Sequence, residues 1–177
     1  MEFNEDMKYL EPPAHACVRQ NQDFIWVYTD SGRGLVAYDP QGKDVILGLD
    51  ADDAALGVAV REALACSRLL SPKEAMKFLD YRERGDEYKK RVKSLMCMHG
   101  YKNKSAMFKN MKSCSITLSQ GKIEISPTIH KTLDGWVRKK NDGIEDVLIP
   151  ANSPAHEIGV ALRLAFSRCL ECWNHGP

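Results

Sequence analysis

Two cysteines near the C-terminus have the spacing of a metal or redox motif. Cys169 and Cys172 are separated by two residues, as in many zinc sites and dithiol centres. A structural zinc ion needs four ligands, and the sequence offers only His175 nearby. The alternative is that both thiols, one helical turn apart, face a hydrophobic core. We therefore predict no metal site and no cofactor.

A third cysteine lies close to a histidine, in the run Cys97-Met98-His99. Catalytic thiols and imidazoles meet in space, so closeness along the chain carries little weight. We interpret the run as a core cysteine followed by a surface histidine at a helix end. We expect that the protein is not an enzyme and has no catalytic residue. A thiol-dependent enzyme that uses Cys97 or Cys169 stays as an alternative.

Charge is distributed unevenly, although the net charge of the 177 residues is only +1. Residues 1–87 hold 17 acidic and 10 basic side chains, whereas residues 88–124 hold nine basic side chains and the single acid Glu124. Charge separated in this way can steer a charged partner. The two regions could also neutralise each other on one folded surface, and the sequence leaves both interpretations open.

The basic segment 88–112 carries the main competing hypothesis, a nucleic-acid-binding module. Eight basic side chains are interleaved there with Tyr88, Tyr101 and Phe108, and aromatic rings can stack on bases. The basic residues are Lys89, Lys90, Arg91, Lys93, Lys102, Lys104, Lys109 and Lys112. Against this, the isoelectric point of about 7.6 is low for a dedicated nucleic-acid-binding domain. Met107, Phe108 and Met111 also fit the core-facing stripe of a helix.

The elements that must position these groups alternate between short strands and helices. Strands are expected at residues 24–28, 35–38, 45–47, 115–118, 122–125, 135–137 and 147–149. Helices are expected at residues 52–70, from 72 onward, 86–98, 105–111 and 153–172. Asp52-Asp53 and Asp86-Glu87 stand at expected helix starts, where capping and the helix dipole explain paired carboxylates without catalysis. Ser71 is expected to cap the second helix and Ser153 the last one.

An internal repeat with an offset of 102 residues organises the chain. Asp44-Val45-Ile46-Leu47 recurs as Asp146-Val147-Leu148-Ile149, and Leu56-Gly57 through Arg61 recurs as Ile158-Gly159 through Arg163. We predict an α+β fold, a pseudo-duplicated strands-then-helix repeat with a mostly antiparallel sheet covered by helices. Residues 1–177 would form a single domain, with repeat halves 22–71 and 114–172 and a helical linker 72–112. The two glycines are expected to let each helix approach the sheet closely.

Location follows from two features of the sequence. No run of 18 apolar residues is present, and the N-terminus is acidic, so neither a membrane span nor a secretory signal is expected. We expect a cytoplasmic protein whose six cysteines stay reduced. Cys66 and Cys114 lie inside apolar patterns and are expected in the core.

Three stretches carry a resemblance to a known family. They are residues 56–68, the run Phe108-Lys109-Asn110-Met111-Lys112-Ser113-Cys114, and residues 146–169. Together they resemble the immunity proteins of bacterial contact-dependent growth inhibition systems, over about residues 20–172. The resemblance implies an inhibitor that binds a delivered toxin domain, often a nuclease acting on RNA. It implies no catalytic residue, and Gly57, Gly159, Asn110 and Cys114 would belong to the framework.

The toxin-binding face is predicted from charge. A toxin that cleaves RNA must bind a polyanion, so an acidic inhibitor surface could occupy its basic cleft and raise the association rate. Tyr38 and Tyr81 are candidate aromatic anchors. The acidic candidates are Asp50, Asp52, Asp53, Glu83, Asp86 and Glu87.

Overall fold

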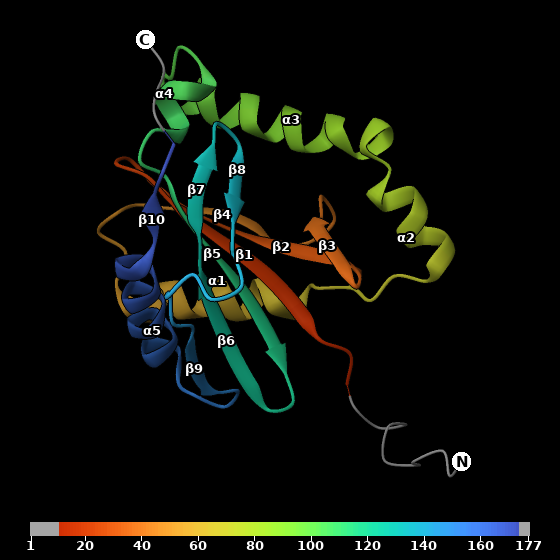
Figure 1. The fold of residues 1–177 in the computed structure, drawn as a ribbon, viewed down its shortest axis with the longest axis vertical. Coiled ribbons are helices and arrows are strands. Elements are labelled where there is room, and N and C mark those ends of the chain that lie inside the picture. The colour runs from red at the N-terminus through yellow and green to blue at the C-terminus, as the bar shows by residue number, and fades with distance from the viewer. Residues whose placement is uncertain (1–10, 174–177) are drawn as a thin grey trace.

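A long antiparallel sheet forms the centre of the computed structural model, which describes residues 11–173 (Figure 1). Its strands are β1 (Ala14–Gln20), β2 (Ile25–Arg33), β3 (Leu35–Tyr38), β4 (Asp44–Leu47), β5 (Lys112–Ser119), β6 (Lys122–Pro127) and β9 (Val147–Pro150). The order is β3-β2-β1-β5-β6-β9, and β4 pairs with the first part of β2. This arrangement confirms the predicted α+β fold with a mostly antiparallel sheet.

Five helices and a small second sheet complete the described part of the chain. The helices are α1 (Asp53–Ala65), α2 (Pro72–Leu79), α3 (Tyr81–Met98), α4 (Lys104–Phe108) and α5 (Ala155–Arg168). The second sheet has the order β10-β7-β8, with β7 (Ile129–Thr132), β8 (Gly135–Val137) and β10 (Leu170–Glu171). In Figure 1, α3 runs along the top of the view, whereas α1 crosses the middle of the view behind strands of the large sheet, with α5 beside it.

The two faces of the large sheet bury two separate hydrophobic clusters, because side chains alternate along each strand. Val18 and Val27 point to one face and pack against α1 and α5. Cys17, Trp26 and Tyr28 point to the other face and pack against α3 and α4. We call these the α1/α5 layer and the α3/α4 layer. The second layer is rich in aromatic rings, and Trp26 within it is fully buried.

The repeat gives the fold an approximate two-fold symmetry. The order β1, β2, β4, α1 matches the order β5, β6, β9, α5. The matching strands β1 and β5 pair at the centre, where Cys17 lies opposite Ser115. On one side of this pair Val18 lies opposite Cys114, and on the other side Ala16 lies opposite Ile116. The symmetry axis therefore passes close to Cys17 and Ser115.

The repeated glycines bring the two helices together, and the prediction that they would bring each helix to the sheet is wrong. A Cβ atom on Gly57 would lie 1.8 Å from the carbonyl oxygen of Ala155 in α5. Reciprocally, a Cβ atom on Gly159 would lie 2.0 Å from the carbonyl oxygen of Asp53 in α1. Both contacts are too short for any side chain, so only glycine permits this helix crossing.

Two repeated arginines reinforce the helix crossing from its ends. Arg61 on α1 donates hydrogen bonds to the carbonyls of Ala151 and Ser153, just before α5. Arg163 on α5 donates to the carbonyl of Ala51 at 2.5 Å and to the carboxylate of Asp53 at 2.6 Å. Each helix thus holds the chain that leads into the other.

Several element boundaries differ from those predicted. β1, β7 and β10 were not expected as strands, and α1 ends at Ala65 instead of residue 70. Capping of α2 by Ser71 is confirmed, with Glu74 as its reciprocal partner. The start of α5 is Ala155 with Pro154 at the cap, so Ser153 does not cap it. Because α5 ends at Arg168, residues 169 and 172 do not share a helix face.

Candidate functional site

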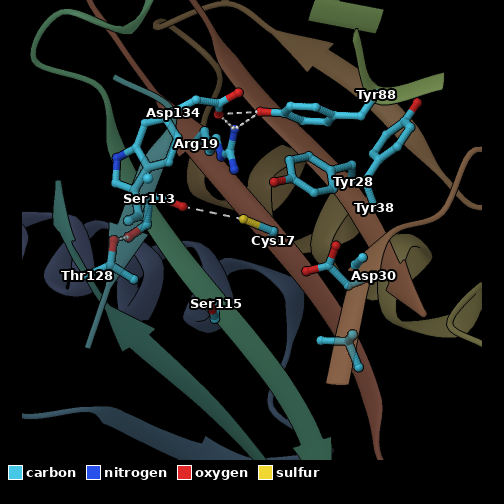
Figure 2. Close-up of a pocket in the computed structure, with 14 residues that line it drawn as sticks. Cys17, Arg19, Tyr28, Asp30, Tyr38, Tyr88, Ser113, Ser115, Thr128 and Asp134 are labelled. Atoms are coloured by element: carbon cyan, nitrogen blue, oxygen red, sulfur yellow. Dashed lines mark hydrogen bonds and ion pairs between the residues drawn. The ribbon is translucent and has the colours of Figure 1, made fainter. Parts of the chain in front are cut away.

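A cavity of about 360 Å³ opens on the α3/α4 side of the large sheet (Figure 2). Its lining comes from β1, β2, β3, β5, α3 and β8, so both repeat units contribute to it. The cavity lies beside the symmetry axis, because Cys17 and Ser115 are among its lining residues. Its lining combines charged, hydroxyl and aromatic side chains.

Arg19 projects from β1 into a cage of aromatic rings. Its guanidinium carbon lies 4.1 Å from the ring centre of Trp136. The rings of Trp26, Tyr28 and Tyr88 surround it at 5.6 to 5.7 Å. The side chain is only 12% exposed, which strengthens the attraction between the cation and the rings.

A hydroxyl and a carboxylate complete the surroundings of Arg19. Its Nη1 atom donates to the Tyr88 hydroxyl at 2.6 Å, and that hydroxyl donates to the Asp134 carboxylate at 2.7 Å. Arg19 and Asp134 themselves are 3.7 Å apart. Burial alone would lower the pKa of Arg19, but its tyrosine neighbours and Asp134 raise it overall. The site therefore holds a permanent cation with one carboxylate beside it.

The floor of the cavity is polar and is formed by a thiol and two hydroxyl side chains. The Cys17 Sγ atom lies 3.4 Å from the Ser113 Oγ atom, and Thr128 donates to the carbonyl of Ser113 at 2.6 Å. Burial raises the pKa of the Cys17 thiol, which keeps the sulfur protonated and unreactive. The cavity therefore presents aromatic rings, hydroxyls and a protonated thiol.

A second hollow of about 460 Å³ lies between the β3–β4 turn and α2. Its lining includes Arg68, Phe78 and Glu87. Arg68 holds the turn by a two-pronged bond to the buried carboxylate of Asp39, at 2.8 and 3.0 Å. Figure 1 shows this corner of the molecule, where α2 extends away from the sheet.

The acidic residues predicted to form one face are divided between the two layers. Asp50, Asp52 and Asp53 stand at the start of α1, in the α1/α5 layer. Asp52 caps α1 by accepting from the Ala55 amide at 2.7 Å, which confirms its predicted capping position. Asp53 is held by Arg163. Two of these three carboxylates therefore have partners within the fold.

The remaining predicted residues lie toward α3 and the aromatic layer. Asp86 and Glu87 are exposed in the interior of α3, which begins at Tyr81, so their predicted place at a helix start is wrong. Glu87 pairs with Lys90 at 2.8 Å. Tyr38 lines the Arg19 cavity and donates to Asp44 at 2.7 Å. The side chains of Tyr81 and Glu83 lie outside the described residues.

The basic segment does not present the aromatic platform that nucleic-acid binding would use. Tyr88, Tyr101 and Phe108 all pack into the α3/α4 layer. Arg91 is paired with Asp44, which also binds Trp26 and Tyr38. Exposed lysines remain along α3, but the aromatic rings of the segment are turned inward. The described surface of this segment therefore offers charge without stacking.

The cysteine motifs are not assembled into sites in the described part of the chain. Within residues 11–173, no group of three His, Cys, Asp or Glu side chains is placed to hold a metal ion, and His175 lies outside that range. Cys172 is exposed, so it does not face the core with Cys169. Cys97 and Cys66 are also exposed, contrary to their predicted core positions, while His99 stacks on Phe24 at 4.4 Å. Cys114 is buried, as predicted.

Among the described helices, none is long and apolar enough to cross a membrane.

Comparison with known proteins gives the family. The profile of the CDI immunity protein family matches residues 14–169, which include both repeat units and the Arg19 cavity. The chain belongs to the CDI immunity protein family. The immunity protein CdiI-YPIII of Yersinia pseudotuberculosis is 38% identical over 175 residues, which is 92% of this chain and 99% of the relative. The resemblance seen in the sequence is thereby confirmed.

Two solved structures have the same fold as this CDI immunity protein. One is a CdiA-CT/CdiI toxin and immunity complex from Yersinia pseudotuberculosis, with a TM-score of 0.82 and 37% identity. The match spans 90% of this chain and 99% of the matched chain. The other is a protein of unknown function from Neisseria meningitidis, also with a TM-score of 0.82 and 37% identity, covering 96% and 99%.

The residues at the centre of the cavity were not predicted from the sequence. Arg19 and Asp134 are far apart along the chain and belong to no recognisable motif. A signal was present in residues 14–20, where apolar Ala16 and Val18 alternate with polar neighbours as in a strand. Such an alternation would have placed Cys17 and Arg19 together on one face of the sheet.

Proposed function

We propose that this protein binds and neutralises the C-terminal toxin domain of its cognate contact-dependent growth inhibition system, without catalysing a reaction. The observation that carries the proposal is likeness over nearly the whole chain to an immunity protein solved together with its toxin. A second support is the cavity chemistry, which offers rings and hydroxyls but no activated nucleophile. The protein would act in the cytoplasm of a bacterial cell.

The finer proposal is that the toxin is a nuclease, with RNA as the expected substrate. A nuclease needs a basic cleft to hold a polyanion, and acidic side chains can compete for that cleft. Both the start of α1 and the outer side of α3 present exposed carboxylates. Either surface could therefore meet a basic toxin, and the two must be separated by experiment.

We favour the α3 side as the docking face. Glu87 borders the hollow beside α2, and Tyr38 lines the Arg19 cavity. Hollows and aromatic rings are typical of binding hot spots. At the start of α1, Asp52 and Asp53 already serve the fold through the helix cap and Arg163. Asp50 is the remaining exposed carboxylate at the start of α1, and it serves as the comparison for Glu87.

The proposed function is tested with the cognate toxin domain, sought as the C-terminal domain of a large secreted protein encoded by a neighbouring gene. The two are co-expressed, and we expect them to co-purify as a stable complex. The free toxin domain should degrade RNA, and addition of this protein should stop it; DNA is assayed in parallel to identify the substrate. Failure to capture or inhibit the toxin, together with a turnover reaction by this protein alone, would contradict the proposal.

Matched charge reversals test the docking face. Glu87→Lys should slow association with the toxin about tenfold at low salt, because it replaces attraction by repulsion at the contact. Asp50→Lys makes the same charge change in the other layer and should leave the rate within about twofold. Stopped-flow fluorescence at 20 mM and 500 mM NaCl measures both, and the high salt should remove the difference. The opposite pattern would place the contact at the start of α1.

A further inference from the structure

Two cysteines from distant parts of the chain meet beneath the end of α5. The Sγ atoms of Cys114, in the central strand β5, and Cys169, which caps α5, are 3.7 Å apart. Both thiols are free, and 55 residues separate them along the chain. This pair lies in the α1/α5 layer, on the side of the sheet opposite the Arg19 cavity. The proposed function makes no use of it.

The two thiols have different surroundings. Cys114 is fully buried, whereas Cys169 is partly exposed at the edge of the same cluster. A hydrogen bond with Cys114, helped by backbone hydrogen bonds at Thr128 and Ser113, outweighs the opposing effect of burial and lowers the pKa of Cys169 to about 7. Burial raises the pKa of Cys114. Cys169 is thus the partly exposed and more readily ionised thiol of the pair, and Cys114 is its shielded neighbour.

We propose that Cys114 and Cys169 form a disulfide when the protein meets hydrogen peroxide, so that the end of α5 becomes covalently tied to β5. The sulfurs must approach by about 1.7 Å to reach the length of a disulfide bond. Cys169 can supply this movement, because it is the cap residue where α5 ends and not an interior helical residue. The proposal is independent of the toxin and of the docking face.

The chemistry needs only peroxide as the oxidant. The Cys169 thiolate attacks one peroxide oxygen, the O–O bond breaks, and hydroxide leaves and takes up a proton to become water. The resulting sulfenic acid is then attacked by the sulfur of Cys114, which gives up its proton. The S–O bond breaks, and the departing hydroxide takes that proton as a second water. Two thiols are oxidised by two electrons, and one peroxide is reduced to two waters.

Peptide mapping of the full-length protein tests the proposal. The reduced protein is treated with one equivalent of hydrogen peroxide, free thiols are alkylated, and the digest is examined by mass spectrometry. We expect a linked peptide that joins Cys114 to Cys169, and a melting temperature about 5 °C higher than in dithiothreitol. Cys169→Ser should abolish both effects. Cys66→Ser, which removes an exposed thiol elsewhere, should abolish neither.

The pH dependence of the oxidation rate provides a second readout. Cys169 should be oxidised about tenfold faster at pH 8 than at pH 6, because its thiolate fraction follows a pKa of about 7. A thiol of ordinary pKa would change about a hundredfold over this interval. The proposal is overturned if Cys114 stays fully alkylated while exposed thiols oxidise. A linked peptide joining Cys169 to Cys172 instead of Cys114 would overturn it equally.

Discussion

A buried arginine is the residue around which the aromatic layer is arranged. Removing a guanidinium from water is costly unless rings and polar partners replace the lost hydration. Arg19 obtains both, from the face of Trp136 and from Tyr88 with Asp134. These partners come from β8, α3 and the turn between β7 and β8. One side chain therefore connects the large sheet, a helix and the small sheet.

Replacing Arg19 should reveal this connection as lost stability. Arg19→Met keeps most of the apolar volume but removes the cation, and we expect the free energy of unfolding to fall by about 2 kcal/mol. Urea unfolding followed by tryptophan fluorescence measures the change. Arg82→Met, at an exposed position of α3, is the control and should change stability by less than about 0.5 kcal/mol. Equal effects of the two substitutions would show that the ring cage contributes nothing.

Arg19 also shows why the site escaped prediction. The first strand was predicted to start near Phe24, so the segment Ala14–Gln20 that holds Arg19 was assigned no strand. Cation–aromatic contacts depend on rings that arrive from other elements, and no local pattern reports them. The caps at Asp52 and Ser71 were predictable because each depends only on residues three positions away.

At the scale of elements, the helix pair α1 and α5 contains the clearest relation between sequence and structure. The repeat offset of 102 predicted two equivalent strand-and-helix units, and the structure confirms them. What the offset could not indicate was the partner of each glycine. Gly57 packs against the start of α5, and Gly159 packs against the start of α1. The repeat units are therefore joined through their helices as well as through β1 and β5.

The glycine crossing predicts a non-additive pair of substitutions. Gly57→Ala and Gly159→Ala should each destabilise the protein by about 3 kcal/mol, because the new methyl group forces the helices apart. The double variant should lose less than the sum, since helices that have already separated accommodate the second methyl group. Val58→Ala, an exposed neighbour on α1, is the control. Chemical denaturation of the four variants measures these values, and strict additivity would contradict a shared crossing.

Helix ends were less predictable than helix cores. The last helix was expected to continue to Cys172, yet α5 ends at Arg168 and Cys169 turns toward β5. The chain then joins the small sheet, where Leu170 pairs with Ile129. This two-residue strand has no local signature of its own. It forms because β7 presents a free edge at that point, which is information from the tertiary structure.

At the scale of the whole molecule, the two buried clusters share one sheet but no side chains. Successive residues of β1 serve opposite layers, with Val18 in one cluster and Cys17 in the other. Unfolding of either layer would therefore expose one face of the same strands. Trp26 and Trp136 report on the α3/α4 layer, whereas the helical signal comes from both layers, from α1 and α5 on one side of the sheet and from α3 and α4 on the other.

This arrangement predicts a single cooperative unfolding transition. Tryptophan fluorescence and the helical circular dichroism signal should give the same urea midpoint, because neither layer can keep its strands flat and paired without the other. Val60→Ala opens a space in the α1/α5 layer, where Val60 is fully buried, and should cost about 2 kcal/mol. Although the tryptophans lie across the sheet, their transition should shift by the same amount as the helical signal. A helical signal that splits into two steps, of which one shifts while the tryptophan transition stays in place, would mean that the layers unfold separately and that the sheet does not couple them.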